Sequence, residues 1–394
     1  MPPLLPPRQR ALDILRGASV ALMILVNNPG SWSHLYPPLA HAPWHGVTPT
    51  DLVFPFFLFA VGNALAFVLP GLRAAGAAVF WRRVLLRTLV IFSIGLLLNA
   101  SPFVRWDETG ALLPRDWETL RLMGVLQRIA LSFGAAAALV WLLPPRAVPW
   151  AAAALLVGYW LACRAFGDSA EPYSLAGWFG TAFDRALLGA SHLYRGEGLP
   201  FDPEGLASTP PAVAQVLIGW WAGELVRRKT LAQAADAGLV AGLFLRALVL
   251  LAAAYVWGLE MPFNKKIWTS SYVLLTSGLA LAALASLIHV VDIRRRPAEQ
   301  WGWARVLEAF GRNPLFIFVL SGLVPRFLAL WRWPALDPAA ATPWMSPLPW
   351  LHQHVFADLS SDPRFGSLLY AVAHLACYAL LAWWLDRRRI YLRV

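Results

Sequence analysis

Apolar segments about as long as a bilayer is thick recur from one end of this chain to the other. A transmembrane helix needs roughly 20 consecutive apolar residues. The sequence offers ten such windows, at about 11–28, 51–70, 80–99, 124–143, 147–164, 210–226, 238–257, 268–289, 305–330 and 366–385. Only 14% of the residues are charged, against roughly 25% in a soluble domain. The pattern predicts an all-α, polytopic transmembrane helical bundle of about ten spans, with residues 1–394 as a single transmembrane domain.

The distribution of charge predicts the orientation of this bundle. The net charge is +11, and the basic residues fall at the termini and in the even-numbered connections. They are Arg8, Arg10, Arg73, Arg82, Arg83, Arg146, Arg227, Arg228, Lys229, Arg294, Arg295, Arg296, Arg387, Arg388 and Arg389. Cytoplasmic loops of membrane proteins carry this excess of Lys and Arg. We therefore expect both termini in the cytoplasm, the long connections 29–50, 100–123, 165–209 and 331–365 outside, and no nucleic acid as a partner.

The stretch HAPWHGVTPTDLVFPFFLF, residues 41–59, places two histidines just before the second apolar window. Thr48, Pro49 and Asp51 form a helix start, with a capping threonine, a proline at the first position and an acid at the third. The positive end of the helix dipole then lies beside the histidines and favours a developing negative charge. Pro55 lacks an N–H, so a neighbouring group or water has to satisfy the carbonyl that it frees.

Several polar side chains are expected at the same outer level. Asn27 ends the first window, and Asn, Pro and Gly after it also suit an ordinary turn. His41 and His45 are candidate general bases, although loop histidines are common and the chemistry needs only one. Further candidates for the outer site are Arg128, Asp184, His192, Asp202, Glu204, Asn264 and Lys265. A plain tight turn for the FDPEG stretch and a rim position for Lys265 remain the structural alternatives.

At the cytoplasmic level, ionisable groups inside apolar windows are functional candidates by default. Asp13 and Arg16 lie three residues apart in the first window, and Arg312 and Asn313 lie in the ninth. A pair of side chains reaching to the headgroups explains Asp13 and Arg16 equally well.

Other chemistries lack their motifs. The chain has no phosphate-binding glycine loop and no G-x-S-x-G turn, and its histidines and acids form no convincing metal-ligand spacing, so we expect no metal. Cys163 and Cys377 both fall in apolar windows and offer no disulfide framework. The N-terminal stretch runs directly into the first window, which predicts an uncleaved anchor.

From Arg10 to the C-terminus the chain resembles the heparan-α-glucosaminide N-acetyltransferase family, membrane enzymes that use acetyl-CoA to acetylate a sugar amine. The blocks that carry the resemblance are RALDILRG, ILVN, HAPWHGVTPTDLVFPFFLF, GVLQR, DRALLGASHLY, FDPEGL, NKKIWTSSYV and GRNPLFIF. The HAxWxGxTxxDLVFPFF string is highly specific, whereas LDxxRG is typical of a wider group of membrane acyltransferases.

The resemblance implies a site and a cofactor. It marks His41 as the catalytic histidine and Asn27 as its partner, with acetyl-CoA entering from the cytoplasm. Coenzyme contacts are then expected at Arg16, Arg128, Lys265, Arg312 and Asn313. Acceptor contacts are expected at His45, Asp184, His192, Asp202, Glu204 and Asn264. The family precedent also suggests a homodimer.

Three differences from the lysosomal enzyme concern the acceptor. The chain lacks that enzyme's N-terminal luminal domain and first helix, which predicts a bacterial-type homologue in the inner (plasma) membrane. It has His45 where that enzyme has asparagine, and Leu320–Ser321–Gly322 where it has a histidine–glutamate pair. We expect an amino sugar or another glycan amine as the acceptor.

Two mechanisms and two other functions stay open at this point. The acetyl group moves either directly to the amine, which one shared pocket favours, or through an acetyl-histidine. A transporter of a small solute or glycan would also explain polar groups in spans, but the sequence has no paired interrupted segments in two halves. A scaffold role leaves HAPWHG and FNKK unexplained.

Overall fold

The computed structural model describes residues 9–107, 109–232, 234–294, 302–335 and 344–392. Its helices are α1 (Arg10–Asn27), α2 (Val53–Ala74), α3 (Ala77–Ala100), α4 (Val125–Leu142), α5 (Val148–Phe166), α6 (Phe179–Leu188), α7 (Thr209–Ala232), α8 (Ala237–Gly258), α9 (Ser270–Leu287), α10 (Gly302–Arg312), α11 (Pro314–Leu328), α12 (Pro347–Leu351) and α13 (Pro363–Arg387). Shorter helical turns are η1 (Pro37–Leu39), η2 (Pro49–Leu52), η3 (Ala190–His192), η4 (Ile288–Ile293), η6 (His352–Phe356) and η7 (Ala357–Leu359). Two small antiparallel hairpins pair β1 (Val104–Trp106) with β2 (Leu112–Pro114) and β3 (Trp333–Pro334) with β4 (Trp344–Met345).

A helix lies at each of the ten predicted windows, so the all-α class is confirmed. Among the described residues, seven helices are long and apolar enough to cross a membrane, or up to eight if α10 and α11 count as one bent span. α1 and α7 occupy predicted windows but are not among those seven, so the number ten stays a prediction. The chain is a multi-pass membrane protein.

The ninth window, predicted at about 305–330, is not one straight helix, and whether it crosses the membrane as a single bent span stays a prediction. α10 and α11 meet at an angle of 84°. Asn313 breaks the helix with φ −128° and ψ 46°, and Pro314 begins the next one. Proline fits the first turn of a helix but cannot continue a preceding one, which explains a break at this point.

The centre of the bundle is the contact between α2 and α7. A Cβ on Gly62 would lie 1.9 Å from the carbonyl oxygen of Val216, and one on Gly219 would lie 2.1 Å from that of Phe59. Only glycine lets the two backbones approach this closely, as in other membrane helix pairs with small residues at the contact.

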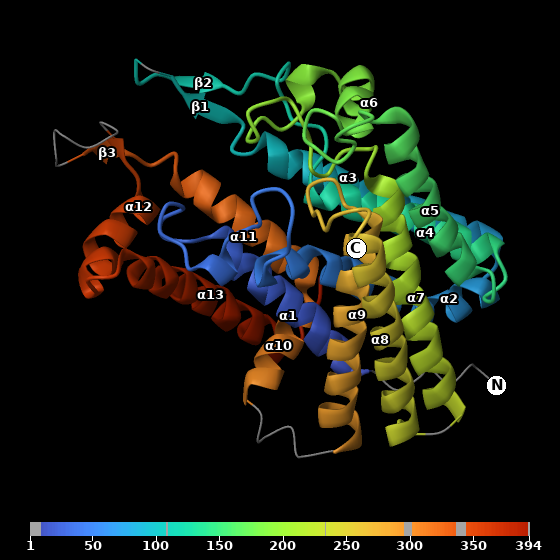
Figure 1. Cartoon of the computed structure of the whole chain (residues 1–394). Helices are drawn as coiled ribbons and strands as arrows, with labels where there is room; N and C mark the ends of the chain where they lie inside the picture. The colour runs from blue at the N-terminus through green and yellow to red at the C-terminus, as the bar shows by residue number, and fades with distance from the viewer. Residues whose placement is uncertain (1–8, 108, 233, 295–301, 336–343, 393–394) are drawn as a thin grey trace.

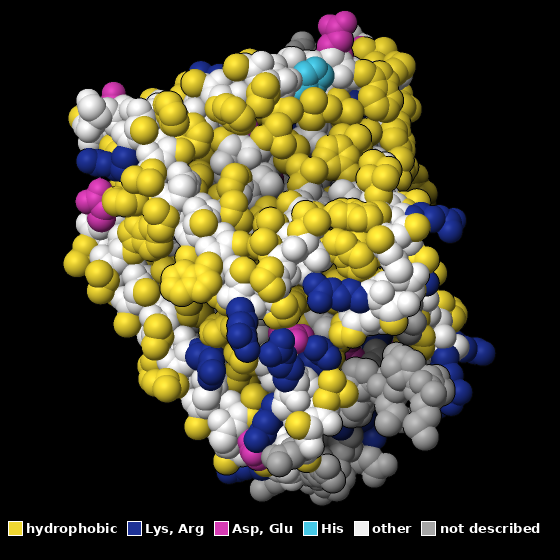
Figure 2. Space-filling model, turned by 90° about the vertical axis from the view of Figure 1, so that its right-hand side faces the viewer, with side chains coloured by type: hydrophobic (Ala, Val, Ile, Leu, Met, Phe, Trp, Pro, Cys, Tyr) yellow, Lys and Arg dark blue, Asp and Glu magenta, His cyan; other side chains and the backbone are white. Residues whose placement is uncertain are grey.

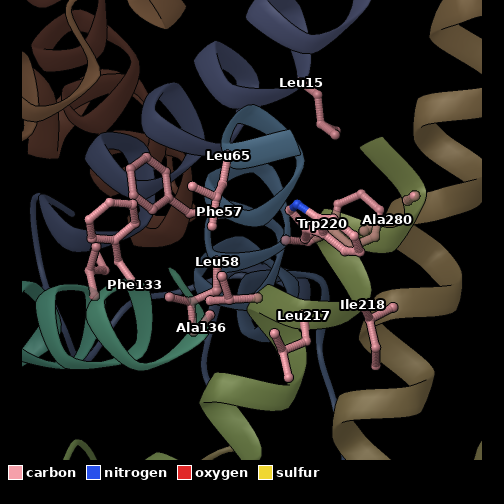
Figure 3. Packing of buried hydrophobic residues seen from close by; sticks show 14 of the residues in the cluster. Leu15, Phe57, Leu58, Leu65, Phe133, Ala136, Leu217, Ile218, Trp220 and Ala280 are labelled. Carbon is pink, nitrogen blue, oxygen red and sulfur yellow. The ribbon is translucent and has the colours of Figure 1, made fainter. Parts of the chain in front are cut away.

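Aromatic and aliphatic side chains fill the space around this contact. In Figure 3, α2 lies between α4, which contributes Phe133 and Ala136, and α7, which contributes Leu217 and Trp220. Helices α3 and α8 lie further out, and only 22% of the apolar window of each is buried inside the protein. Their outward apolar faces are those expected of helices in contact with lipid.

The two ends of the bundle differ in composition. In Figure 1, α6 and the hairpin β1–β2 lie at the top, whereas the connection from α7 to α8 lies at the bottom. Figure 2 shows a face covered mainly by hydrophobic side chains, with most of its Lys and Arg in the lower half. We call the end that holds segments 41–52, 201–205 and 259–269 the site end, and the opposite end the basic end. Three of the predicted basic residues, Arg8, Arg295 and Arg296, lie outside the described residues.

Candidate active site

The HAPWHG segment is held against the start of the second span by Asp51. The 3₁₀ turn η2 begins after Thr48, and Asp51 and Thr48 form the predicted capping box. Asp51 Oδ2 accepts hydrogen bonds from the backbone N–H groups of Ala42 and Thr48, each at 3.0 Å. Its side chain is only 1% exposed. The local sequence therefore folds the histidine segment back onto a buried carboxylate.

The second oxygen of that carboxylate faces His41. The distance from His41 Nδ1 to Asp51 Oδ1 is 2.7 Å. A carboxylate at this position selects the imidazole tautomer that carries its proton on Nδ1 and leaves a lone pair on Nε2. The His41 side chain is 40% exposed, so a substrate can reach it. The pair has the geometry of a general base and the group that orients it.

Tyr272 satisfies the carbonyl that Pro55 frees. Pro55 lies in the first turn of α2, and the residue four positions before it is Asp51. The hydroxyl of Tyr272 on α9 donates to the carbonyl oxygen of Asp51 at 2.5 Å. Asp51 is thus fixed through both its side chain and its backbone, which confirms that a neighbouring group meets this carbonyl.

Lys265 contacts both members of the pair. Its Nζ lies 3.1 Å from Nδ1 and 3.3 Å from Nε2 of His41, and 3.6 Å from Oδ1 of Asp51. Burial lowers the pKa of Lys265, while Asp51 and Glu204 act to raise it. The structure therefore places Lys265 against His41 at the site end, and not at the basic end.

Segment 259–269 anchors the histidine segment from the other side. Asn264 is fully buried, its Oδ1 accepts from Ile267 N at 3.1 Å, and its Nδ2 lies 3.4 Å from Nδ1 of the exposed His45. Burial lowers the pKa of His45. Lys266 donates to the carbonyl of Pro43 and to Glu197, both at 2.6 Å.

The FDPEG turn is organised by Arg121. Its guanidinium donates to both oxygens of Asp202, from Nε at 2.8 Å and from Nη2 at 2.6 Å, and to Glu204 Oε2 at 2.5 Å. Asp202 is fully buried and Glu204 is partly exposed. Burial alone would raise the pKa of Glu204, but Arg121 and Arg128 hold that pKa below its usual range. Glu204 stays ionised and faces the Lys265 side of the site.

Arg128 and Asp184 lie beneath this turn. Arg128 is completely buried, donates to the carbonyl of Gly205 at 2.8 Å and to Ser208 Oγ at 2.5 Å, and lies over the Trp268 ring at 5.4 Å. Asp184 accepts from Ala207 N at 3.0 Å, and burial raises its pKa to about 6. A Cβ on Gly205 would lie 1.9 Å from Asp184 Oδ2. These contacts show that Arg128 and Asp184 support the turn from inside.

Two other predicted residues of the site end, His192 and Asn27, are not part of the His41–Asp51 pair. His192 Nδ1 lies 2.7 Å from the carbonyl of Leu120, and its own carbonyl accepts from Leu122 N at 3.1 Å. It therefore holds the segment that carries Arg121. Asn27 is exposed at the end of α1, and within the described part of the chain no hydrogen bond joins its side chain to His41.

The predicted residues at the basic end are brought together by α10. Arg16 donates to the carbonyl of Gly311 at 2.8 Å and to Asp13 at 2.7 Å. Arg312 pairs with Asp386 on α13, and Asn313 donates to the carbonyl of Ile390 at 2.9 Å. These side chains hold α1, α10 and the C-terminal segment together.

Two residues of the site were not on the predicted list of site residues. Asp51 looked like a helix cap, and it is one, but its second oxygen also orients His41. Arg121 lay in a connection with no motif of its own. A buried acid ten residues after a candidate base was the available signal for Asp51, whereas Arg121 gave none. Among the described residues, no group of three or more His, Cys, Asp or Glu side chains is placed to hold a metal ion.

The profile of the family "Heparan-alpha-glucosaminide N-acetyltransferase, catalytic" matches residues 8–253. This chain belongs to that family. The match includes His41, Asp51, Arg121 and the FDPEG turn, and it ends before Lys265, which only the fold brings to His41.

Two curated relatives are named heparan-alpha-glucosaminide N-acetyltransferase. The human protein is 27% identical over 340 residues, covering 74% of this chain and 50% of its own length. The mouse protein is 26% identical over 336 residues, covering 73% of this chain and 50% of its own length. The chain therefore spans about half the length of the curated relatives that it matches. At the level of the family, these relatives support a membrane enzyme that transfers acetyl groups.

Proposed function

We propose that this heparan-α-glucosaminide N-acetyltransferase relative moves an acetyl group from acetyl-CoA to the amine of an amino sugar, with His41 as the general base. The contact that carries the proposal is the 2.7 Å approach of His41 Nδ1 to the buried carboxylate of Asp51. It leaves Nε2 of an accessible imidazole available to accept a proton. A purely structural histidine has no need of this arrangement.

The chemistry requires a base because a sugar ammonium is not a nucleophile. The coenzyme supplies a thioester carbonyl that a neutral amine can attack. His41 Nε2 takes the amine proton as the new carbon–nitrogen bond forms, and Asp51 stabilises the resulting imidazolium. The carbon–sulfur bond of the thioester then breaks, and His41 gives this proton to the departing thiolate of the coenzyme. General-base assistance of this kind is typically worth about 10² to 10⁴ in rate. We favour direct transfer, since Nε2 then serves as a base and not as a carrier.

Negative charge on the carbonyl oxygen needs a donor or a positive field. Asn27, exposed at the end of α1, is the proposed side-chain donor, and loss of such a donor typically costs about 10² to 10³ in rate. The N-terminus of the η2–α2 segment adds its dipole at the same end of the bundle.

The proposed acceptor subsite is formed by the partly exposed Glu204 and the exposed His45, with the buried Asn264 next to His45. Glu204 is ionised and partly exposed, which suits an ammonium or sugar hydroxyls. Asp202, with both oxygens bonded to Arg121, and the buried Asp184 act as supports of this subsite. His192 acts in the same way through its hold on segment 120–122.

The coenzyme is proposed to enter from the basic end. Arg16 and Arg312 are each only partly buried, with 24% and 22% of their side chains exposed, so a phosphate can compete for them with their carboxylate partners. In this orientation the basic end faces the cytoplasm, the site end faces outward, and the protein lies in the inner (plasma) membrane. Lys265 and Arg128 lie at the site end, where only the acetyl end of the coenzyme would reach them.

The test is acetylation by purified protein. Radiolabelled acetyl-CoA and glucosamine are supplied, with galactosamine and a simple alkyl amine as comparisons, and labelled N-acetyl product is measured. We expect product with an amino sugar, loss of product in His41→Gln, and retained product in the control His34→Gln, whose ring contacts Ser31 and Ser33 and is not part of the proposed site. An active His41→Gln protein would refute the assignment of the base. Absence of product with every amine, together with solute flux in liposomes, would favour a transporter.

A further inference from the structure

Lys265 takes a position at His41 that neither a rim lysine nor a coenzyme ligand needs. Its Nζ is almost equally distant from the two ring nitrogens, at 3.1 Å and 3.3 Å. The two nitrogens flank Cε1, so an atom at these distances in the ring plane would collide with carbon atoms of the ring. The Lys265 ammonium therefore lies over the face of the imidazole. The in-plane lone pair of Nε2 is left unobstructed.

Burial lowers the pKa of Lys265, and the carboxylates around it act in the opposite direction. Asp51 Oδ1 lies 3.6 Å from Nζ, and Glu204 also acts on Lys265 to favour the ammonium. Lys265 is itself half-buried, so its charge is screened less than that of a surface lysine. A cation thus lies in contact with the ring whose protonation decides its use as a base.

Asp51, Lys266 and His45 also lie in or against the histidine segment. Asp51 acts on the His41 ring in the opposite direction to Lys265, because a carboxylate stabilises the imidazolium. Lys266 is bonded to Pro43 and Glu197. Nδ1 of His45 lies 3.4 Å from Nδ2 of Asn264, and among the residues that the structure describes no hydrogen bond or ion pair joins His45 to His41. The groups in direct contact with the imidazole are Asp51 and Lys265, with opposite signs.

We propose that Lys265 is a positioning residue that disfavours the imidazolium form of His41 by placing its ammonium over the face of the imidazole. A cation over a neutral ring is attractive, whereas a cation over an imidazolium is repulsive. Asp51 fixes the tautomer and makes Nε2 a stronger base, and Lys265 prevents that base from being occupied by a solvent proton before the acceptor arrives. The same charge disfavours a protonated acceptor amine beside Nε2.

This inference deepens the proposed function and rests on it for its meaning, but it can be tested without any acetyl transfer. Diethyl pyrocarbonate modifies only the unprotonated imidazole, so the rate of His41 modification against pH gives its titration midpoint. The modified His41 peptide is followed by mass spectrometry between pH 5 and pH 9, and the His34 peptide serves as a reference in each sample.

Three variants are compared with the natural protein. In Lys265→Met we expect the His41 midpoint to rise by about 1 pH unit or more, since removal of a nearby cation favours the imidazolium. Lys265→Arg keeps the charge and should keep the midpoint. Lys266→Met is the matched control, because it removes the adjacent lysine without removing a contact to His41. Lys265→Gln replaces the methionine variant if that protein does not purify as a folded species.

A His41 midpoint that stays unchanged or falls in the uncharged Lys265 variant, whether methionine or its glutamine replacement, would overturn the proposal. If the His41 midpoint rises in Lys265→Met but the natural protein acetylates no amine, the role of Lys265 stands and the proposed function is refuted. Where acetylation is observed, the acid limb of its pH–rate profile should move upward by the same amount as the labelling midpoint. A general loss of rate without that movement would indicate a merely structural lysine.

Discussion

Replacement of Asp51 by Asn tests the histidine–aspartate pair with almost no change in shape. Two backbone N–H groups, those of Ala42 and Thr48, donate to Oδ2 at 3.0 Å. In the variant the amide oxygen has to occupy that position, because an amide nitrogen cannot accept these bonds. The amide NH₂ group then takes the place of Oδ1, which lies 2.7 Å from Nδ1 of His41.

A donor at this position reverses the tautomer of the imidazole. Nδ1 now has to accept, so the ring proton moves to Nε2, and the lone pair that served as the base is lost. We expect kcat to fall by about 10² to 10⁴, the range that general-base catalysis supplies, with the larger value matching the effect of a wrong tautomer in catalytic triads. Protein stability should change by no more than about 1 to 2 kcal/mol, since the cap bonds remain.

The assay measures acetyl transfer to glucosamine together with thermal unfolding of the same preparation. Thr48→Val is the matched control, because it removes the hydroxyl that donates to Asp51 Oδ2 at 3.0 Å and leaves Oδ1 facing His41. Its kcat should remain within about tenfold of the natural value. A comparable loss in both variants would show that the cap and not the tautomer matters. An Asp51→Asn protein with nearly natural kcat would refute the reasoning.

Three further predictions concern the supports of the site. Because burial raises the pKa of Asp184 to about 6, the folded protein holds this proton more tightly than the unfolded chain, so stability should fall as pH rises from about 4 to about 6 by up to roughly 2 to 3 kcal/mol. Asp184→Asn should remove that slope in thermal unfolding measured against pH. Arg121→Met leaves the two carboxylates of the FDPEG turn without their partner and should cost about 3 to 5 kcal/mol, measured as unfolding in detergent, whereas a change near zero would show that the turn folds independently. Gly219→Ala places a Cβ 2.1 Å from a backbone carbonyl and should destabilise the protein by about 1 to 3 kcal/mol, while Gly71→Ala on α2, where no atom lies within 4 Å, should be neutral in the same measurement.

The helices could be predicted from the sequence because bilayer-length apolar windows leave few other structures. The break between α10 and α11 was harder to anticipate. GRNP contains the proline that ends α10, but the 84° bend depends on Asn313 bonding to the chain near Ile390, which is a long-range contact.

The site could be predicted from the sequence only in part, because some of its contacts join residues that are far apart in the chain. The helix-start pattern located Asp51 and the freed carbonyl, but only the fold shows that Tyr272 meets that carbonyl. Lys265 was identified as a candidate and expected to contact the coenzyme, whereas the structure shows it against His41. A cation and a base 224 positions apart have no local pattern that joins them.

The most direct test of the account is transfer across a sealed membrane. The protein is reconstituted into liposomes that enclose radiolabelled acetyl-CoA, glucosamine is added outside, and external N-acetylglucosamine is measured. We predict labelled product outside with the natural protein and background levels with His41→Gln. Product that forms only when coenzyme and amine share one compartment, or forms equally well without His41, would contradict a base at the site end that receives its acetyl group from the opposite face.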